Sequence, residues 1–238
     1  MKATKLLVTI FAFSMLMTSC STDEELNEPE VSAALLKSFT ITKNVNGEYS
    51  VGYTTENATS QLIKNEKANT SEIFLYASNA LLSKSFSEAL TLNSDKLKVG
   101  FVDTNTDKKP TITIIDNNIV FAKGSKDDSM LNDYNITGNE DGTYTLAFSV
   151  KNQVEADFVY NEEIDTYEIH LVKGKGNVSD FSREFEANTN ALRIDFVNHK
   201  NTAAKGYAYR AAEAEAERKP RIVVDSGNYS EENDDIIP

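Results

Sequence analysis

The chain has 238 residues, with 37 acidic and 24 basic side chains, one cysteine and no tryptophan. A net charge of -13 opposes a phosphate backbone, which argues against nucleic-acid binding through a basic surface. One cysteine excludes an internal disulfide and a cysteine-based zinc cluster. Because 40% of the residues are apolar, the chain can still build a hydrophobic core.

Residues 1–19 predict an export signal. Lys2 and Lys5 precede an apolar run over residues 6–17 that is too short to span a bilayer as a mature helix. The run ends in the letters MTSC at positions 17–20, and small residues before a cysteine resemble the lipobox of bacterial lipoproteins. The resemblance implies cleavage before Cys20 and attachment of palmitate or similar acyl chains to that residue. An ordinary secretory signal is the alternative.

Residues 20–34 predict an acidic tether. It begins Ser21-Thr22-Asp23-Glu24-Glu25, and no basic residue occurs before Lys37. A serine and acidic cluster directly after the lipidated cysteine resembles the export tag of Bacteroidota surface lipoproteins. That resemblance implies a place on the outer membrane, exposed at the cell surface. A solvated tether that leaves the protein facing the periplasm is the alternative. Acidic composition also predicts a disordered tail over residues 225–238.

The body carries an internal repeat at an offset of 95 residues. FTITKNVNGEYSVGYT at 39–54 aligns with YNITGNEDGTYTLAFS at 134–149, and five of these positions are identical. LKVGFVD at 97–103 aligns with LRIDFVN at 192–198 in the same register. The offset then rises to 110 at Lys219-Pro220, so the second copy holds an insertion of about 15 residues. We therefore expect two related units.

Each copy predicts about six short strands. Alternating apolar residues flank Asn46-Gly47 and Asp141-Gly142, which favours a tight hairpin in each copy with both turn residues at positive φ. Residues 181–185 and 192–197 predict a second hairpin around a turn at 188–190. The equivalent segment 84–90 in the first copy fits a strand, and a helix is the alternative.

The predicted fold is all-β, with two tandem β-sandwich-like modules over residues 35–123 and 134–224. A polar linker over 124–133 joins them. One pseudo-symmetric β-barrel built from both copies is the alternative. The insertion, residues 201–218, is rich in Ala and Glu and predicts a short helix. It is either a covering element or a recognition element, and Tyr207 and Tyr209 in it are the candidate ligand-binding residues.

Candidate chemistry is sparse. Asp103, Asn105 and Asp107 alternate oxygen donors as in a calcium loop, but they lack the glycine and distal glutamate of an EF-hand. Calcium is therefore the one cofactor considered, against a solvated turn. His170 in a strand favours a packed side chain. Asp195 and His199, four residues apart on a strand, are too far apart to form a dyad.

No nucleophile elbow, metalloprotease, P-loop or dinucleotide motif occurs in the sequence. We therefore expect a lipid-anchored envelope protein that is not an enzyme and binds a protein or glycan partner, with no nucleic acid. The alternatives are a hydrolase that uses paired carboxylates and a carrier barrel for an apolar ligand.

Overall fold

The computed structural model describes residues 34–65, 67, 69–79, 82–90, 95–106, 109–116, 130–174, 177–186, 191–199 and 217–227. Contacts divide the chain into two units, Met1–Val31 and Ser32–Pro238, and all described residues belong to the second. These residues form strands and turns, and no helix suited to crossing a membrane occurs among them. The prediction of an all-β fold is confirmed.

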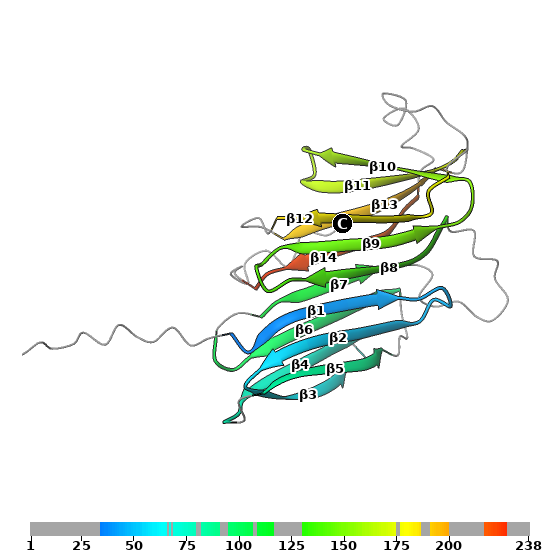
Figure 1. The fold of residues 1–238 in the computed structure, drawn as a ribbon. Helices are drawn as coiled ribbons and strands as arrows, with labels where there is room; N and C mark the ends of the chain where they lie inside the picture. Colours follow the sequence, from blue (N-terminus) through cyan, green and yellow to red (C-terminus); the bar gives the residue numbers. More distant parts are fainter. Residues whose placement is uncertain are drawn as a thin grey trace, which may run out of the picture. The chain divides into compact units, whose positions relative to one another are not determined.

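Two sheets make up this unit (Figure 1). The first has the order β12-β9-β8-β1-β2-β5. Its strands are β1 (Leu36–Lys43), β2 (Tyr49–Glu56), β5 (Ser83–Leu90), β8 (Leu131–Gly138), β9 (Tyr144–Val150) and β12 (Asp180–Phe185). The second has the order β10-β11-β13-β14-β7-β6-β4-β3. Its strands are β3 (Ala58–Asn65), β4 (Thr70–Ala77), β6 (Lys96–Asp103), β7 (Thr111–Ile115), β10 (Val154–Asn161), β11 (Thr166–Lys173), β13 (Leu192–His199) and β14 (Glu217–Asp225).

One hydrophobic core lies between the two sheets. Alternate residues of each strand enter it, as the period of two along a strand requires. The ring of Phe101 in the eight-stranded sheet lies 5.2 Å from Phe39 and 5.7 Å from Tyr53 in the other sheet. Burying an aromatic or branched side chain contributes roughly 1.5–3 kcal/mol, so these contacts hold the two sheets face to face.

The strand order is the same when read from either half of the chain. We call β1–β7 the first half and β8–β14 the second half. In the six-stranded sheet β5-β2-β1 meets β8-β9-β12, and in the eight-stranded sheet β3-β4-β6-β7 meets β14-β13-β11-β10. The halves join through antiparallel pairing of β1 with β8 and of β7 with β14. Both sheets therefore run continuously through the two halves.

The two predicted tight hairpins are present, but their turn differs from the expected type. Among the turn residues only the glycines have positive φ, +80° at Gly47 and +84° at Gly142. The amide of Gly47 donates to the carbonyl of Asn44 at 2.9 Å, and the amide of Gly142 donates to Asn139 at 3.1 Å. The loop is thus longer than a two-residue hairpin turn: a tight turn is followed by one residue with left-handed backbone dihedrals. Glycine adopts these dihedrals without strain, which explains glycine at both positions.

Four element predictions need correction. Residues 84–90 lie in strand β5, so the helical alternative was wrong. The predicted second hairpin was also wrong, because β12 lies in one sheet and β13 in the other. Each half has a seventh strand, β3 or β10, that the sequence did not predict. Strand β8 begins at Leu131, inside the predicted linker, and strand β14 begins at Glu217, inside the predicted helical insertion.

Candidate functional site

The structure describes only some of the predicted site residues. Asp103 ends β6, and its two carboxylate oxygens accept bonds from the amides of Leu35 at 2.7 Å and Asn105 at 2.8 Å. These bonds tie the start of β1 to the end of β6. Among the described residues no three His, Cys, Asp or Glu side chains are grouped as a metal site would require. Calcium binding stays a prediction. Four predicted residues lie outside the described part of the chain: Cys20, Asp107, Tyr207 and Tyr209.

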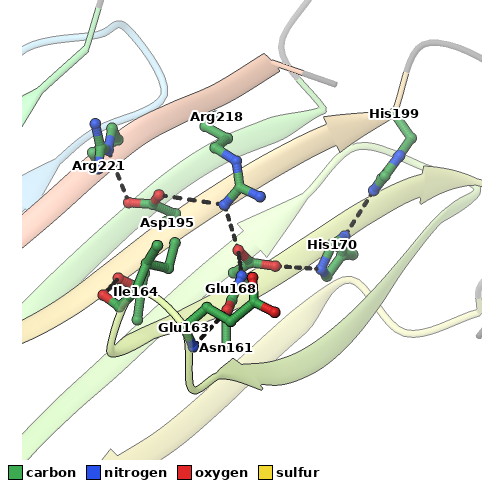
Figure 2. A network of polar contacts seen from close by, with 10 residues as sticks. Asn161, Glu163, Ile164, Glu168, His170, Asp195, His199, Arg218 and Arg221 are labelled. Atoms are coloured by element: carbon green, nitrogen blue, oxygen red, sulfur yellow. Dashed lines mark hydrogen bonds and ion pairs between the residues drawn. The ribbon is translucent and has the colours of Figure 1, made fainter. Parts of the chain in front are cut away.

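A chain of charged and polar side chains crosses the outer face of the eight-stranded sheet, the face away from the core (Figure 2). It lies on β11, β13 and β14, where its residues alternate with core residues such as Ile169 and Ile194. The two histidines and two carboxylates in it are at most 3% exposed. We call it the outer-face network, and it consists of Glu168, His170, Asp195, His199, Arg218 and Arg221.

The histidines form the first part of the outer-face network. Nδ1 of His170 lies 2.8 Å from Nε2 of His199, and Nε2 of His170 lies 3.1 Å from Oε2 of Glu168. A carboxylate only accepts, so we assign the proton on His170 to Nε2. His199 then donates through its own Nε2 to Nδ1 of His170. The arrangement is satisfied with both rings neutral.

The arginines form the second part of the outer-face network. Arg218 contacts Oε1 of Glu168 through Nη1, and the same nitrogen lies 3.7 Å from Oδ2 of Asp195. Nε of Arg221 donates to Oδ1 of Asp195 at 3.2 Å. Asn161 adds a hydrogen bond to Glu168 at 2.9 Å. Each buried carboxylate therefore has a cationic partner, which a buried charge requires.

Burial and charge move the pKa values of this network in different directions. Burial raises the pKa of Glu168, but hydrogen bonds from Arg218 and Asn161 outweigh burial and hold that pKa below its usual value. For Asp195 burial dominates over both arginines and raises the pKa. Burial, with His170 and Arg218 beside the ring, lowers the pKa of His199. These shifts favour the ionised form of Glu168 and the neutral form of His199, whereas burial disfavours the ionised form of Asp195.

The outer-face network lies where the sequence insertion leaves the sheet. His199 is the last residue of β13, and Arg218 is the second residue of β14. Both are held against Glu168 and His170 on the neighbouring strand β11. The two stems of the segment between β13 and β14 are thus fixed to one strand by buried polar contacts.

Among the described residues of the first half, the equivalent strand positions do not repeat this network. Glu72 of the first half pairs with Gly100, whereas its equivalent Glu168 in the second half pairs with Asp195. Glycine therefore stands where the second half has Asp195. Phe74 takes the place of His170. Polar residues that differ between halves of equal topology are not needed for the strand order. The outer-face network is therefore a feature that the described residues show in the second half alone.

Sequence reasoning missed this network, although part of its pattern was visible. Glu168 and His170 alternate with apolar residues in one strand, and Asp195 and His199 lie on one face of another. Asp195 and His199 are four residues apart on strand β13, and this separation along a strand is too long for a direct contact. The partner of His199 is His170, 29 residues earlier, and this contact depends on the parallel pairing of β11 with β13, which was not predicted.

A second buried polar cluster lies between the sheets. Nζ of Lys43 is 2.9 Å from Oδ2 of Asp116, and the hydroxyl of Tyr49 donates to the same oxygen at 3.0 Å. The hydroxyls of Tyr49 and Tyr134 are 2.8 Å apart. Burial, with the neighbouring hydroxyl and Asp116, raises the pKa of Tyr49. All four side chains are at most 5% exposed, so the cluster fixes one arrangement of the sheets.

A small open pocket of about 150 Å³ occurs at the position where the first half meets the turn after β8. Phe39, Phe101 and Tyr144 line it together with Gly138. A Cβ atom at Gly138 would lie 2.3 Å from the ring of Phe39, so glycine is required there. A cavity of this size holds a single ring-sized apolar group.

Comparison of the chain with protein-family models, curated proteins and solved structures finds no match. Function is therefore inferred from the side chains themselves. The carboxylates of the outer-face network bind arginines, and those of Asp103 and Asp116 bind amides or a lysine and a tyrosine. These carboxylates therefore hold strands and the two ends of the insertion in place.

Proposed function

We propose that this protein is a lipid-anchored binding module of the bacterial cell surface and not an enzyme. Acyl chains on Cys20 hold it on the outer membrane, and residues 20–34 act as the tether. The all-β body is the rigid scaffold. The insertion, residues 201–218, is the recognition element for a protein or glycan partner. Loops on a rigid β scaffold commonly carry binding.

The observation that carries the recognition role is the burial of the outer-face network at the base of the insertion. His199 and Arg218 hold the two stems of the insertion on β11, and the histidine is 3% exposed. Ordering six polar side chains costs conformational entropy, and a loop that only connects two strands does not require this ordering. Fixed stems reduce the entropy lost when the insertion binds a partner.

The same contacts argue against the hydrolase alternative. A pair of catalytic carboxylates needs one group free to give a proton and one free to attack or activate water. Glu168 is bound by Arg218 and Asn161, and Asp195 is bound by Arg221. Both are at most 3% exposed. These carboxylates support positioning rather than catalysis.

We further propose that the two halves arose by duplication of one seven-stranded unit. Positive φ recurs at Asn57 and Gln153 and at Asn69 and Asp165, each pair 96 residues apart. A register shift recurs in β1 and β8. Stacked rings recur too: Tyr53 on Phe86 at 5.0 Å and 14°, and Phe148 on Phe181 at 5.0 Å and 13°. The proposal favours one two-sheet body shared by both copies over two separate modules.

Site-specific photo-crosslinking on intact cells tests the recognition role. A photoreactive phenylalanine at position 207 or 209 should give a discrete adduct in the full lipidated chain. The matched control carries it at Val45, which is 69% exposed in a turn of the first half and should give none. Equal adducts from Val45 and from the insertion would contradict the proposal.

A further inference from the structure

A second candidate site lies at the lateral end of the second half, between the edge strands β10 and β12. Arg183 lies on β12, and its guanidinium carbon is 5.0 Å from the ring centre of Phe158 on β10. It is also 5.5 Å from Phe185 and 5.8 Å from Tyr167. All three rings are within the range of a cation–π contact, so they hold the guanidinium between the sheets.

Within the described part of the chain, Arg183 has no acidic partner. It forms no ion pair with any carboxylate of the described residues, although acids outnumber bases in the chain. Its contacts are to ring faces, and its side chain is exposed. Ring faces accept no conventional N–H hydrogen bond, so the planar fork of donors stays available for an oxyanion.

An exposed aromatic ring packs against one of the rings that contact this arginine. Tyr160 on β10 is 45% exposed, and its ring centre is 4.9 Å from that of Tyr167, one of the rings under Arg183. The hydroxyl of Tyr160 donates to Asp165 at 2.6 Å, which fixes the ring. Arg193 lies 3.5 Å from the same carboxylate and offsets its charge.

The first half differs at each of these positions. Val51 and Leu146 are equivalent positions of the two halves. The first pairs with Glu88 and the second with Arg183, so a glutamate stands in the first half where the second has the arginine. Lys64 pairs with Ser71 as Tyr160 pairs with Tyr167, so the exposed ring and the ring beneath it are both absent. Strand pairing is the same in both halves, which means that the fold requires neither the arginine nor the rings.

We propose that Arg183 and Tyr160 form a binding site for a carboxylate-bearing sugar. The carboxylate takes the bidentate position on the Arg183 fork, and the apolar face of the sugar ring stacks on Tyr160. Glu184 and Glu186 follow along the same chain segment and disfavour a ligand of high charge density. The ligand is therefore an isolated acidic sugar in an otherwise neutral saccharide. This site is separate from the insertion of the proposed function.

Titration with methyl β-glucuronide and methyl β-glucoside, followed by chemical-shift changes of backbone amides, tests the proposal. The two probes differ in the carboxylate. We expect the glucuronide to shift amides of β10 and β12 and to bind at least tenfold more tightly than the glucoside. Arg183→Gln should remove that preference. Equal binding of both sugars, or an unchanged preference in Arg183→Gln, would overturn the proposal.

Further variants separate binding from folding. Tyr160→Lys introduces the residue of the first half and should weaken both sugars, since the stacking face is lost. Lys84→Gln removes an exposed cation on β5, the edge strand of the first half, and should leave both titrations unchanged. A blocked glutamate dipeptide is the competing probe. If it binds as tightly as the glucuronide, the site takes an acidic peptide and the sugar assignment is wrong.

Discussion

Nε2 of His199 lies 2.8 Å from Nδ1 of His170 and the His199 ring is nearly inaccessible to water, so burial disfavours a charge on His199. Because the pKa of His199 is lowered by burial and by its neighbours, the folded chain binds fewer protons than the unfolded chain below about pH 6.5. Stability then rises with pH across that window. The contribution of this histidine is present near neutral pH and is lost on acidification.

Thermal unfolding between pH 5.5 and pH 7.5 checks this effect. The native chain should lose stability on acidification by up to about 1.4 kcal/mol per pH unit for one proton. His199→Gln keeps a polar group but cannot titrate, so its pH dependence should be shallower. The raised pKa of Asp195 acts with the opposite sign and is common to both chains, so it cancels in the comparison. Identical pH profiles would contradict the burial of a neutral His199.

The contacts of individual residues were predicted less well from the sequence than the strands or the fold class. The need for glycine at positions 47 and 142 was predicted, because a hairpin turn shows its chemistry in the sequence. The outer-face network was not, since its members come from three strands and meet through the parallel pairing of β11 with β13 and the antiparallel pairing of β13 with β14. Asp103 was read as a calcium candidate, and its two backbone-amide bonds could not be foreseen without the position of Leu35.

At the scale of elements, the pairing of β13 with β14 defines what the insertion can tolerate. Asn198 pairs with Glu217, so the segment between them connects two neighbouring antiparallel strands. Replacing residues 201–216 with Asn-Gly should leave the fold intact. The unfolding free energy should change by no more than about 2 kcal/mol, because loop closure depends weakly on length.

Circular dichroism and thermal unfolding of the shortened chain measure this outcome. A chain in which Gly and Ser replace residues 201–216 at constant length is the control for composition. Both variants should unfold cooperatively, and the Gly/Ser chain that carries the photoreactive residue at position 207 should give no discrete adduct. Loss of cooperative unfolding in both would mean that the insertion belongs to the core and is not a recognition element.

Element prediction succeeded for the central strands and missed β3 and β10, the two edge strands of the eight-stranded sheet. Strands β1, β2, β6 and β9 alternate buried and partly buried residues, and this period is visible in the sequence. The edge strand β3 has mostly exposed residues after Ala58, so its alternation is weak and it was missed. The crossing from β12 to β13 looks like a hairpin in sequence because both flanking segments alternate.

At the scale of the whole molecule, continuous sheets predict a single unfolding transition. Gly47→Val and Gly142→Val place a branched side chain at φ near +80°, where nothing lies within 4 Å of the new Cβ, so the cost comes from the backbone alone. Each should destabilise by about 1–3 kcal/mol. Each should also lower the same melting temperature, by about 2–4 °C per kcal/mol.

Calorimetry of the two glycine variants measures this. Because β1 pairs with β8 and β7 with β14, neither half can unfold without breaking the strand pairs that join it to the other and exposing an edge in both sheets. Glycine to asparagine at the same positions is the matched control and should cost less, since asparagine tolerates positive φ. Two separate transitions, each sensitive to only one variant, would instead support two independent modules.

The sequence repeat predicted the relation between the halves better than it predicted their assembly. An offset of 95 residues was enough to match β1 with β8 and β2 with β9. It could not decide between separate modules and a shared body, because either arrangement satisfies the same alternation. The difference between the two arrangements is which strands pair across the boundary between the halves. That pairing depends on contacts in the shared core between residues far apart in the sequence.

Detergent phase separation of membranes from the native organism, combined with protease treatment of intact cells, tests the anchored surface module most directly. The native chain should partition into the detergent phase and be removed from intact cells by protease. Cys20→Ala should move it to the aqueous phase, because acyl chains contribute roughly 0.8 kcal/mol per buried methylene to membrane binding. A native chain found in the aqueous phase, or one protected from protease on intact cells, would contradict the account.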